Sequence, residues 1–388
     1  MKIVMLLDNS YTNDGRVERE AESLAAAANN VVLFCVKNSM LPDNEIRNSV
    51  VIKRIFDPQL HDFWKTNLLF IHKEIIIAEK PDVLHCHDQL MLHLGASVKK
   101  SLPNCILIYD SHELFHSWPL NVSNYSSKIL FLKSWIVRKY QIARERNNAK
   151  NINYLITVNK SIAAILEKYF KLKNPALTIR NIPVKVDFTT DPKFLRKKFD
   201  IQDSTKILVF IGSAIYPKTL NLEQVIDEVG DQPGLAFVII AGEQGGKKEI
   251  VNYVKSKDYR NIYFHSKVPF PEIGNYLASC DVGLVPTYNK SDLSYWLALD
   301  NKLFEYILAG LPVLATVQPE IAAVVEKYSA GVCIIPDYKN AYLDGLKKIL
   351  ENIGFYKENS KNAGVSLNWQ HESKELLQFY SKLKTNLS

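Results

Sequence analysis

The feature that most constrains the fold is a repeated alternation of short apolar segments with stretches of helical periodicity. In the first part of the chain the apolar segments are KIVMLL, VVLFCV, DVLHCH, CILIYD and YLITVN. After a loop-like stretch with Pro183 and Pro192, the alternation resumes with KILVFIG, LAFVIIAG, NIYFHS, VGLVP and PVLAT. Strands that alternate with helices form parallel sheets covered by helices. The sequence therefore predicts an α/β fold with two Rossmann-like α/β/α domains.

The length of 388 residues also favours two domains of ordinary size. We expect an N-terminal domain over residues 1–184 and a C-terminal domain over residues 185–365, with the join near 184–192. Residues 366–388 have an amphipathic helical pattern, and we expect this helix to pack back on the N-terminal domain. Its apolar face is formed by Leu376, Leu377, Tyr380 and Leu383.

The sequence has no apolar run long enough to span a membrane and no signal-peptide pattern, and these two features indicate the compartment. Its longest apolar runs are no longer than strands, so we expect no transmembrane segment. The start, MKIVMLLDNS, has no cleavage-type pattern, so we expect no signal peptide and a cytoplasmic protein. The five cysteines are scattered in apolar surroundings and predict reduced core thiols. The net charge of +7 does not by itself choose among nucleotides, anionic lipid and nucleic acid.

The loop after the first strand, DNSYTNDGRVERE, lacks the Gly-x-Gly-x-x-Gly pattern of dinucleotide-binding enzymes. This disfavours a nicotinamide-dependent oxidoreductase. Gly15 and Arg16 lie between the first strand and the first helix, where they could bring backbone and a cation to a cleft. The alternative is a turn glycine followed by a solvated arginine.

Two strand-to-helix connections in the second half suit phosphate groups. FIGSAIYPKTLN places Gly212 at a strand end and Lys218 at the start of the next helix, and NKLFEYILAGLPVLA begins a helix with Lys302. Such connections open on one edge of a parallel sheet, so the two lysines would converge on a diphosphate. Glu305, one turn after Lys302, could accept hydrogen bonds from a ribose diol. The alternative is an ion pair between Lys302 and Glu305.

A third candidate segment, YDSHELF, follows an apolar strand of the first half. It places Asp110, His112 and Glu113 at the edge of that sheet. The His112 imidazole could bind a substrate hydroxyl and exchange a proton near neutral pH, whereas the alternative is a structural histidine. His85 and His87 in HCHD share a strand face, but no third ligand can be identified, so we expect no metal.

The ordered set of motifs resembles a known family. NKLFEYILAGLPVLA is similar to the donor-site signature of the two-Rossmann (GT-B) glycosyltransferases, group 1 or family 4. Further similar segments follow in the family's order: DGRVEREAESLA, PDVLHCHD, YDSHELF, YLITVNKSIAAIL, TIRNIPVKVDF, GSAIYPK, IIAGEQGG and NIYFHSKVPFPEIGNYLASCDVGLVP. The resemblance covers nearly the whole chain. It implies two domains facing across a cleft, an acceptor side at 1–184 and a nucleotide-sugar side at 185–365.

The resemblance also implies the activity. A retaining glycosyltransferase would move a sugar from a nucleotide diphosphate sugar to a glycan or lipid-linked acceptor in surface polysaccharide synthesis, with no metal or other cofactor. The alternatives are a nucleotide-sugar epimerase of the same plan, which would need further acid and base carboxylates, and a homologue that binds nucleotide sugar without turnover.

By resemblance, Glu305 holds the donor ribose, Lys302 and Lys218 neutralise the leaving diphosphate, and His112 lies nearest the transferred sugar. The remaining substrate-binding residues that we expect are Gly15, Arg16, Asp110, Glu113, Gly212, Ser213, Gly242, Val268, Pro269 and Asn301. Two positions depart from the family pattern. Leu297 stands where many members have a sugar-binding glutamate, and Ser213 stands where many have an arginine. The donor sugar is therefore left open.

The segment 126–150 mixes basic residues with aromatic and aliphatic ones. Such a helix can lie on an anionic membrane surface, which would make the protein peripheral on the inner face of the membrane and suit a lipid-linked acceptor. The alternative is that its apolar residues pack on the domain and its charges are solvated. Because the stretch is one short helix rather than a stacking platform, we do not expect nucleic-acid binding.

Overall fold

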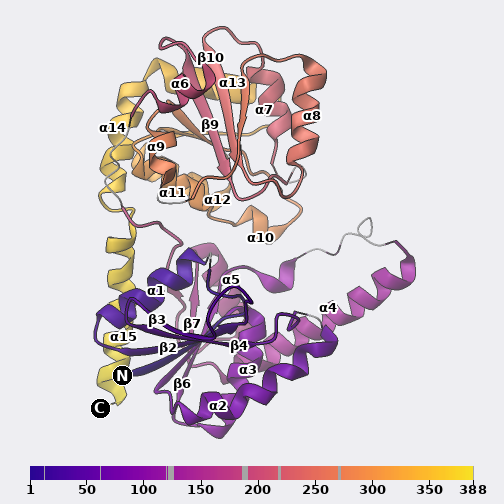
Figure 1. Ribbon diagram of the computed structural model, residues 1–388, viewed down its shortest axis with the longest axis vertical. Helices are drawn as coiled ribbons and strands as arrows, with labels where there is room; N and C mark the ends of the chain where they lie inside the picture. Colours follow the sequence, from indigo (N-terminus) through magenta and orange to yellow (C-terminus); the bar gives the residue numbers. More distant parts are fainter. Residues whose placement is uncertain are drawn as a thin grey trace. The chain divides into compact units, whose positions relative to one another are not determined.

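The computed structural model describes residues 1–12, 14–61, 63–118, 120, 126–185, 191–216, 220–269 and 272–387, with the backbone alone for 63–67. The chain divides into two compact units (Figure 1). The first unit comprises Met1–Asn181 and Glu372–Ser388, and the second comprises Ile182–His371. Each unit contains one sheet of its own.

The first unit is built on an eight-stranded sheet in the order β3-β4-β2-β1-β5-β6-β7-β8. All neighbouring strands are parallel except β3 and β4. The strand order reverses between β1 and β5, and ligands of open α/β sheets bind outside the carboxyl ends of strands at such a point. The strands are β1 (Lys2–Leu6), β2 (Asn30–Val36), β3 (Asn44–Arg47), β4 (Val50–Phe56), β5 (Val83–His87), β6 (Ile106–Ser111), β7 (Tyr154–Thr157) and β8 (Leu177–Thr178).

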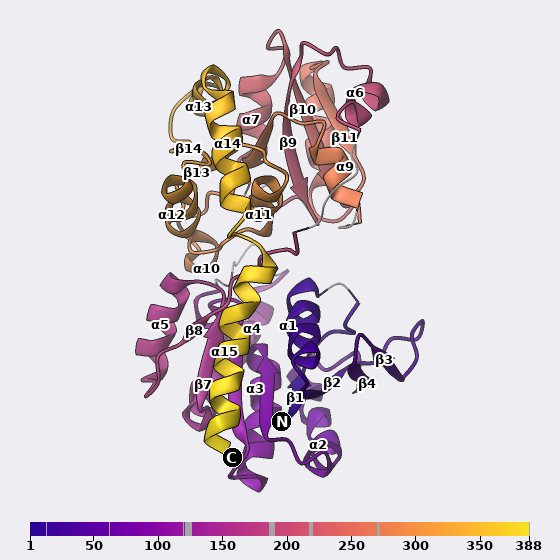
Figure 2. The same cartoon turned by 90° about the vertical axis from the view of Figure 1, so that its left-hand side faces the viewer.

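Helices cover both faces of this sheet. Side chains of β5 alternate between the faces. Cys86 points at Gly95 of α3, where a Cβ would overlap its sulfur. His85 points the other way and lies 2.8 Å from the Tyr380 hydroxyl of α15. The helices of the first unit are α1 (Gly15–Ala26), α2 (Lys73–Ala78), α3 (Asp88–Ser101), α4 (Lys128–Asn148), α5 (Lys160–Phe170) and the part of α15 (Trp369–Leu387) from residue 372 onward (Figure 2).

The second unit contains a six-stranded sheet in the order β11-β10-β9-β12-β13-β14. All of its neighbouring strands are parallel, and the order reverses between β9 and β12. The strands are β9 (Lys206–Gly212), β10 (Leu235–Ala241), β11 (Ile262–His265), β12 (Val282–Val285), β13 (Val313–Thr316) and β14 (Gly331–Ile334).

The apolar run of β9 is explained by burial on both faces. Val209 and Ile211 belong to one core cluster, and Leu208 and Phe210 belong to the other. A parallel strand between two helical layers is buried on both sides, so its sequence is continuously apolar. The helices are α6 (Phe194–Phe199), α7 (Leu222–Val229), α8 (Lys247–Lys257), α9 (Ile273–Leu277), α10 (Leu293–Trp296), α11 (Asn301–Leu308), α12 (Pro319–Tyr328), α13 (Ala341–Glu351) and α14 (Ile353–Gly364).

The two parallel-sheet units confirm the predicted α/β class with Rossmann-like domains. All five cysteines are unpaired, as their spacing predicts. Among the helices of the described residues, none is both long enough and apolar enough to span a bilayer.

Candidate active site

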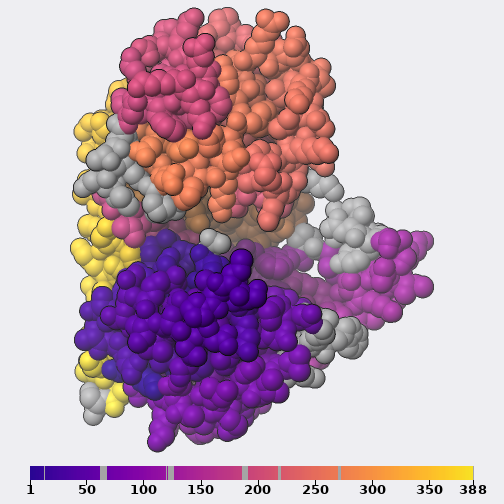
Figure 3. Space-filling view, viewed as in Figure 1, coloured from indigo at the N-terminus to yellow at the C-terminus, as the bar shows by residue number. Residues whose placement is uncertain are grey.

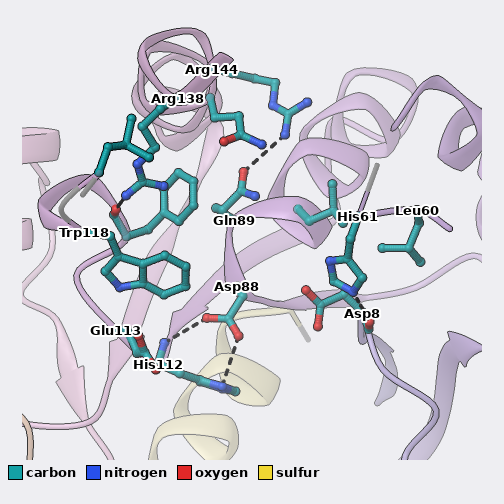
Figure 4. A pocket seen from close by; sticks show the side chains of 14 residues that line it. Asp8, Leu60, His61, Asp88, Gln89, His112, Glu113, Trp118, Arg138 and Arg144 are labelled. Carbon is teal, nitrogen blue, oxygen red and sulfur yellow. Dashed lines mark hydrogen bonds and ion pairs between the residues drawn. The ribbon is translucent and has the colours of Figure 1, made fainter. Parts of the chain in front are cut away.

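A pocket of about 500 Å³ opens in the first unit beside the strand-order reversal. Asp8 follows β1, Asp88 follows β5 and His112 follows β6, so the pocket lies at the carboxyl ends of three adjacent strands. Figure 4 shows Asp8, Asp88 and His112 on one side of the pocket, with Arg138 and Arg144 of α4 across from them. This is the position that the strand order assigns to a ligand site.

His112 is held between two carboxylates. Its Nδ1 lies 3.3 Å from Asp88 and its Nε2 lies 3.3 Å from Asp110, while its backbone N–H donates to Asp88 at 3.2 Å. Asp88 has φ of 61°, a conformation that non-glycine residues rarely adopt and that the surrounding hydrogen bonds stabilise. The imidazole remains 19% exposed toward the pocket. The two acids therefore fix the ring while leaving it accessible to a ligand.

Burial tends to lower the pKa of His112, but the charges of Asp88 and Asp110 outweigh it and raise the pKa well above its ordinary value. The ring therefore keeps its proton at neutral pH and acts as a hydrogen-bond donor. The expectation of proton exchange near neutral pH was wrong, because the sequence did not show that two acids flank the ring. Burial and the charge of Asp88 raise the pKa of Asp8 to about 6.

Behind His112 lies a buried charge network. Arg16 is paired with Asp110 at 2.9 Å and with Glu20 at 3.1 Å, and these three side chains are nearly inaccessible to water. Burial raises the pKa of Asp110, but Arg16 and His112 outweigh it and hold that pKa well below its usual range. Arg16 lies in the first turn of α1, which begins at Gly15, rather than in the preceding loop. The positive charge of Arg16 therefore keeps Asp110 ionised, and Asp110 orients His112.

The histidines of HCHD belong to this network. Four side chains place their donor atoms within 4.8 Å of one another: Glu20, His85, His87 and Asp110. The two carboxylates are the further potential metal ligands that the sequence did not show beside the histidines. The guanidinium of Arg16, however, already contacts both carboxylates. A second cation at the same carboxylates would be repelled, so the donor set does not suit a divalent metal. Burial and the neighbouring His85 lower the pKa of His87 to about 4, which keeps His87 neutral.

The second candidate site lies at the strand-order reversal of the second unit. Lys302, in the first turn of α11, contacts the Asp300 carboxylate at 2.8 Å and lies over the ring of Phe210 in β9. Asp300 also accepts a hydrogen bond from Thr287, which follows β12, at 2.7 Å. Asp300 therefore positions the lysine rather than capping α11 with its side chain, and Asn301 is exposed beside it.

One residue fixes α11 on the sheet. The Tyr306 hydroxyl accepts from the Ile211 backbone N–H at 3.0 Å and contacts the carbonyls of Val209 and Leu284. Gly283 of β12 makes this possible, because a Cβ there would overlap the Tyr306 ring. This contact holds the start of α11 beside the ends of β9 and β12. Glu305, next to Tyr306, is half-buried.

The glycine-containing turns of this unit meet at the same edge. A Cβ on Gly242, after β10, would overlap the carbonyl of Ser213, after β9, so the turns of Gly212 and Gly242 pack together. Ser213 and Pro269 are exposed, whereas Val268 is buried in the core, which leaves its backbone as the part available to a ligand. Leu297 is also buried. Lys218 lies outside the described residues.

The structure adds pocket residues that sequence reasoning missed. Asp88 ends the HCHD motif, and its place at a strand-to-helix junction was the available signal. The sequence presents Arg138 and Arg144 only as part of the basic segment 126–150, and no motif points to Trp118. Their contribution to the pocket depends on where α4 packs, which local sequence does not determine. Glu113 also lines the pocket.

The chain has the fold of the GT-B glycosyltransferases. Sucrose-phosphate synthase from Thermosynechococcus elongatus superposes with a TM-score of 0.77 at 16% identity, covering 100% of both chains. Anabaena Alr3699/HepE in complex with UDP-glucose gives 0.70 at 14% identity, covering 99% of this chain and 100% of that one. At these identities the similarity shows the fold alone.

Sequence comparison shows the family. The model of glycosyl transferases group 1 matches residues 205–352, and that of glycosyltransferase family 4 matches residues 16–182. An uncharacterized glycosyltransferase of Methanocaldococcus jannaschii, MJ1607, is 21% identical over 366 residues, covering 88% of this chain and 86% of its own. The chain belongs to the group 1, family 4 glycosyltransferases, as its motifs predict.

Proposed function

We propose that this glycosyltransferase is a retaining enzyme that moves a sugar from a nucleotide diphosphate sugar to a glycan or lipid-linked acceptor. The observation that supports this best is the position of Lys302. A half-buried lysine held by Asp300 at the start of α11, at the strand-order reversal, suits the diphosphate of a donor. The similarity to HepE, whose complex contains UDP-glucose, agrees with such a donor.

In this proposal Lys302 and the first backbone N–H groups of α11 bind the diphosphate, and Glu305 accepts hydrogen bonds from the ribose hydroxyls. Gly212, Ser213, Gly242 and the backbone near Val268 and Pro269 line the rest of the donor site. The bond between the sugar C1 and the phosphate oxygen breaks, and its electron pair stays on the diphosphate. Positioned cations stabilise that developing charge more in the transition state than in the ground state, so no metal is required.

The acceptor hydroxyl attacks C1 from the side that the diphosphate leaves, which retains the configuration at C1. The oxygen of the acceptor forms the new bond to C1, and its proton passes to the departing phosphate oxygen. His112, kept protonated by Asp88 and Asp110, places its positive charge beside the transferred sugar, with its two ring nitrogens directed at those acids. Asp110 and Arg16 are positioning residues in this scheme, because they act through His112.

We further propose that α4 attaches the protein to the inner face of a membrane. A lipid-linked acceptor for surface polysaccharide synthesis would be held in that membrane. Figure 3 shows the first half of α4 standing out from the first unit. The exposed fractions of its apolar side chains there include 68% for Ile129, 55% for Ile136 and 44% for Trp135, beside the exposed Lys133 and Lys139. Exposed apolar side chains among lysines suit an anionic lipid surface.

The double substitution of Trp135→Ser with Ile136→Ser tests the attachment. It should lower severalfold the fraction of protein that co-sediments with anionic vesicles, and an unchanged fraction would refute the attachment.

A thermal-shift panel of nucleotide sugars tests the donor proposal. A ligand at 100 times its Kd stabilises the folded state by about 2.7 kcal/mol, so a uridine or guanosine diphosphate sugar should raise the melting temperature. Lys302→Met and Glu305→Gln should lose most of this rise, whereas Lys255→Met, the same change at an exposed lysine of α8, should keep it. Equal rises in all four proteins would refute the site.

Product analysis tests the reaction. The new linkage should keep the donor's configuration at C1 by NMR, and Glu305→Ala and His112→Ala should both abolish transfer. A changed donor sugar in the absence of acceptor would indicate the epimerase instead, and binding without any product would indicate the inactive homologue.

A further inference from the structure

The pocket of the first unit contains two arginines whose charges are not matched by carboxylates. Arg138 and Arg144 reach the pocket from α4, and within the described part of the chain neither forms an ion pair with an acid. Arg138 is 9% exposed and Arg144 is partly buried, so both guanidinium groups are partly removed from water, and this burial lowers the pKa of each. A desolvated cation without a counter-ion destabilises the free protein and gains most when an anion binds.

The contacts of the two arginines leave donors available. Arg138 donates to the Phe115 carbonyl and stacks on the Phe115 ring, with its guanidinium carbon 3.8 Å from the ring centroid. Arg144 donates to the Gln89 side-chain oxygen at 3.3 Å, and its buried Nε has no partner among the described atoms. A guanidinium has five N–H donors in a fixed fork, so each side chain can still hold a planar or tetrahedral oxyanion.

The acids near this side of the pocket do not compensate the arginines. Glu145, the carboxylate whose charge most affects Arg138, accepts a hydrogen bond from Tyr109 at 2.7 Å, and burial raises its pKa to about 7. Asp88 is paired with His112, and Figure 4 shows Gln89 between Asp88 and Arg144. The α4 side of the pocket is therefore the electropositive side.

An apolar wall adjoins the arginines. The Phe115 and Trp118 rings meet edge to face with centroids 5.5 Å apart, and Trp118 is 44% exposed. An exposed indole face beside hydrogen-bonding groups suits the C–H-rich face of a sugar ring. The wall and the arginines together indicate a ligand with a ring and an anionic group.

We propose that the α4 side of this pocket binds a phosphate group carried by the acceptor, with Arg138 and Arg144 as the phosphate ligands and Trp118 against the adjoining sugar. This rests on the proposed function, because it names the acceptor class of the same enzyme. The phosphate belongs either to a sugar phosphate or to the head group of a lipid carrier, and the chemistry of recognition is the same for both.

The test measures phosphate binding by the full chain without any nucleotide sugar. Calorimetric titration compares glucose 1-phosphate with methyl glucoside, which has the same ring and no charge, and a second arm compares phosphatidylglycerol with phosphatidylcholine vesicles. Arg144→Gln should weaken binding of the phosphate probe roughly tenfold or more, because one charge-assisted contact is lost. Arg144→Lys keeps the charge and should recover most of the affinity.

Arg146→Gln is the matched control, since it removes the same charge from an exposed position of the same helix. Thermal melting of each variant reports whether α4 stays folded. Weakening in the glucose 1-phosphate arm by Arg144→Gln alone supports a sugar phosphate, and weakening confined to the vesicle arm supports a lipid head group. Equal effects of the two glutamine variants, equal affinity for methyl glucoside, or no binding in either arm would overturn the proposal. The donor panel does not involve this site, so the two proposals fail separately.

Discussion

The substitution Asp88→Asn tests the electrostatic account of His112 most directly. It removes one of the two carboxylates that flank the ring and keeps the size of the side chain. Asp88 lies 3.3 Å from His112 Nδ1, opposite the 3.3 Å contact of Nε2 with Asp110. We expect the pKa of His112 to fall, while Asp110 continues to hold it above the ordinary histidine value.

The size of the fall follows from the contact. Opposite unit charges about 4 Å apart interact by about 4 kcal/mol at an effective dielectric constant of about 20. At about 1.4 kcal/mol per pKa unit this corresponds to about 3 units. The Asp88 side chain is 39% exposed, so water screens the pair. We therefore expect a fall of roughly 1–2 units.

The assay is an NMR titration of the labelled histidine ring, with His112 assigned by its own substitution among the nine histidines. Asp8 gives a second readout, because the charge of Asp88 helps to raise the Asp8 pKa to about 6, and this value should fall in the variant. Asp43→Asn, the same change at an exposed loop residue, should shift neither group. If the His112 pKa moves by less than about half a unit, the reasoning is wrong.

The ion pair between His112 and Asp88 also makes the free energy of unfolding depend on pH. The folded-state pKa of His112 is raised, so its ion pairs stabilise the fold at pH below the ordinary histidine pKa. This contribution is lost as pH rises through the raised folded-state pKa. Asp88→Asn should therefore lower the free energy of unfolding more at pH 6 than at high pH, measured by urea denaturation.

Two further substitutions test the supports of the two sites. Arg16→Met leaves the buried Asp110 and Glu20 without their cation and should lower the free energy of unfolding by about 3–5 kcal/mol in urea, whereas a loss below about 1 kcal/mol would show that the network does not need Arg16. Tyr306→Phe leaves the Ile211 N–H without its acceptor and should cost about 1–3 kcal/mol by the same assay, together with a weaker thermal shift by the nucleotide sugar. A variant as stable as wild type would contradict the view that Tyr306 anchors α11.

Much of the fold could be predicted because it is encoded locally. The apolar run of β9 reflects burial on both faces, and Gly310, at φ of 72°, follows the end of α11 at Leu308. The candidate Lys302 could be found because it lies in the first turn of the helix that precedes β13, and the carboxyl ends of parallel strands share one edge. Local periodicity and turn chemistry were sufficient for these features.

The chemistry of the first unit could not be predicted in the same way. The sequence identified His112 but not its two acids as a pair, and it noted His85 and His87 without the buried Glu20 and Arg16 beside them. The arginines of α4 were assigned to a basic helix, whereas in the structure they line the pocket. These side chains belong to different elements, and only their packing brings them together.

By itself the sequence determined the α/β class, the two Rossmann-like sheets and the family, because strand and helix periodicities and ordered motifs are local properties of the chain. Only the tertiary structure decided that two acids hold His112 protonated and that Arg16 pairs with the buried carboxylates that a metal ion would need. It also decided that Arg138 and Arg144 face a pocket. The physical reason is that charge interactions depend on distance and on burial, and both are set by contacts between residues far apart in the chain.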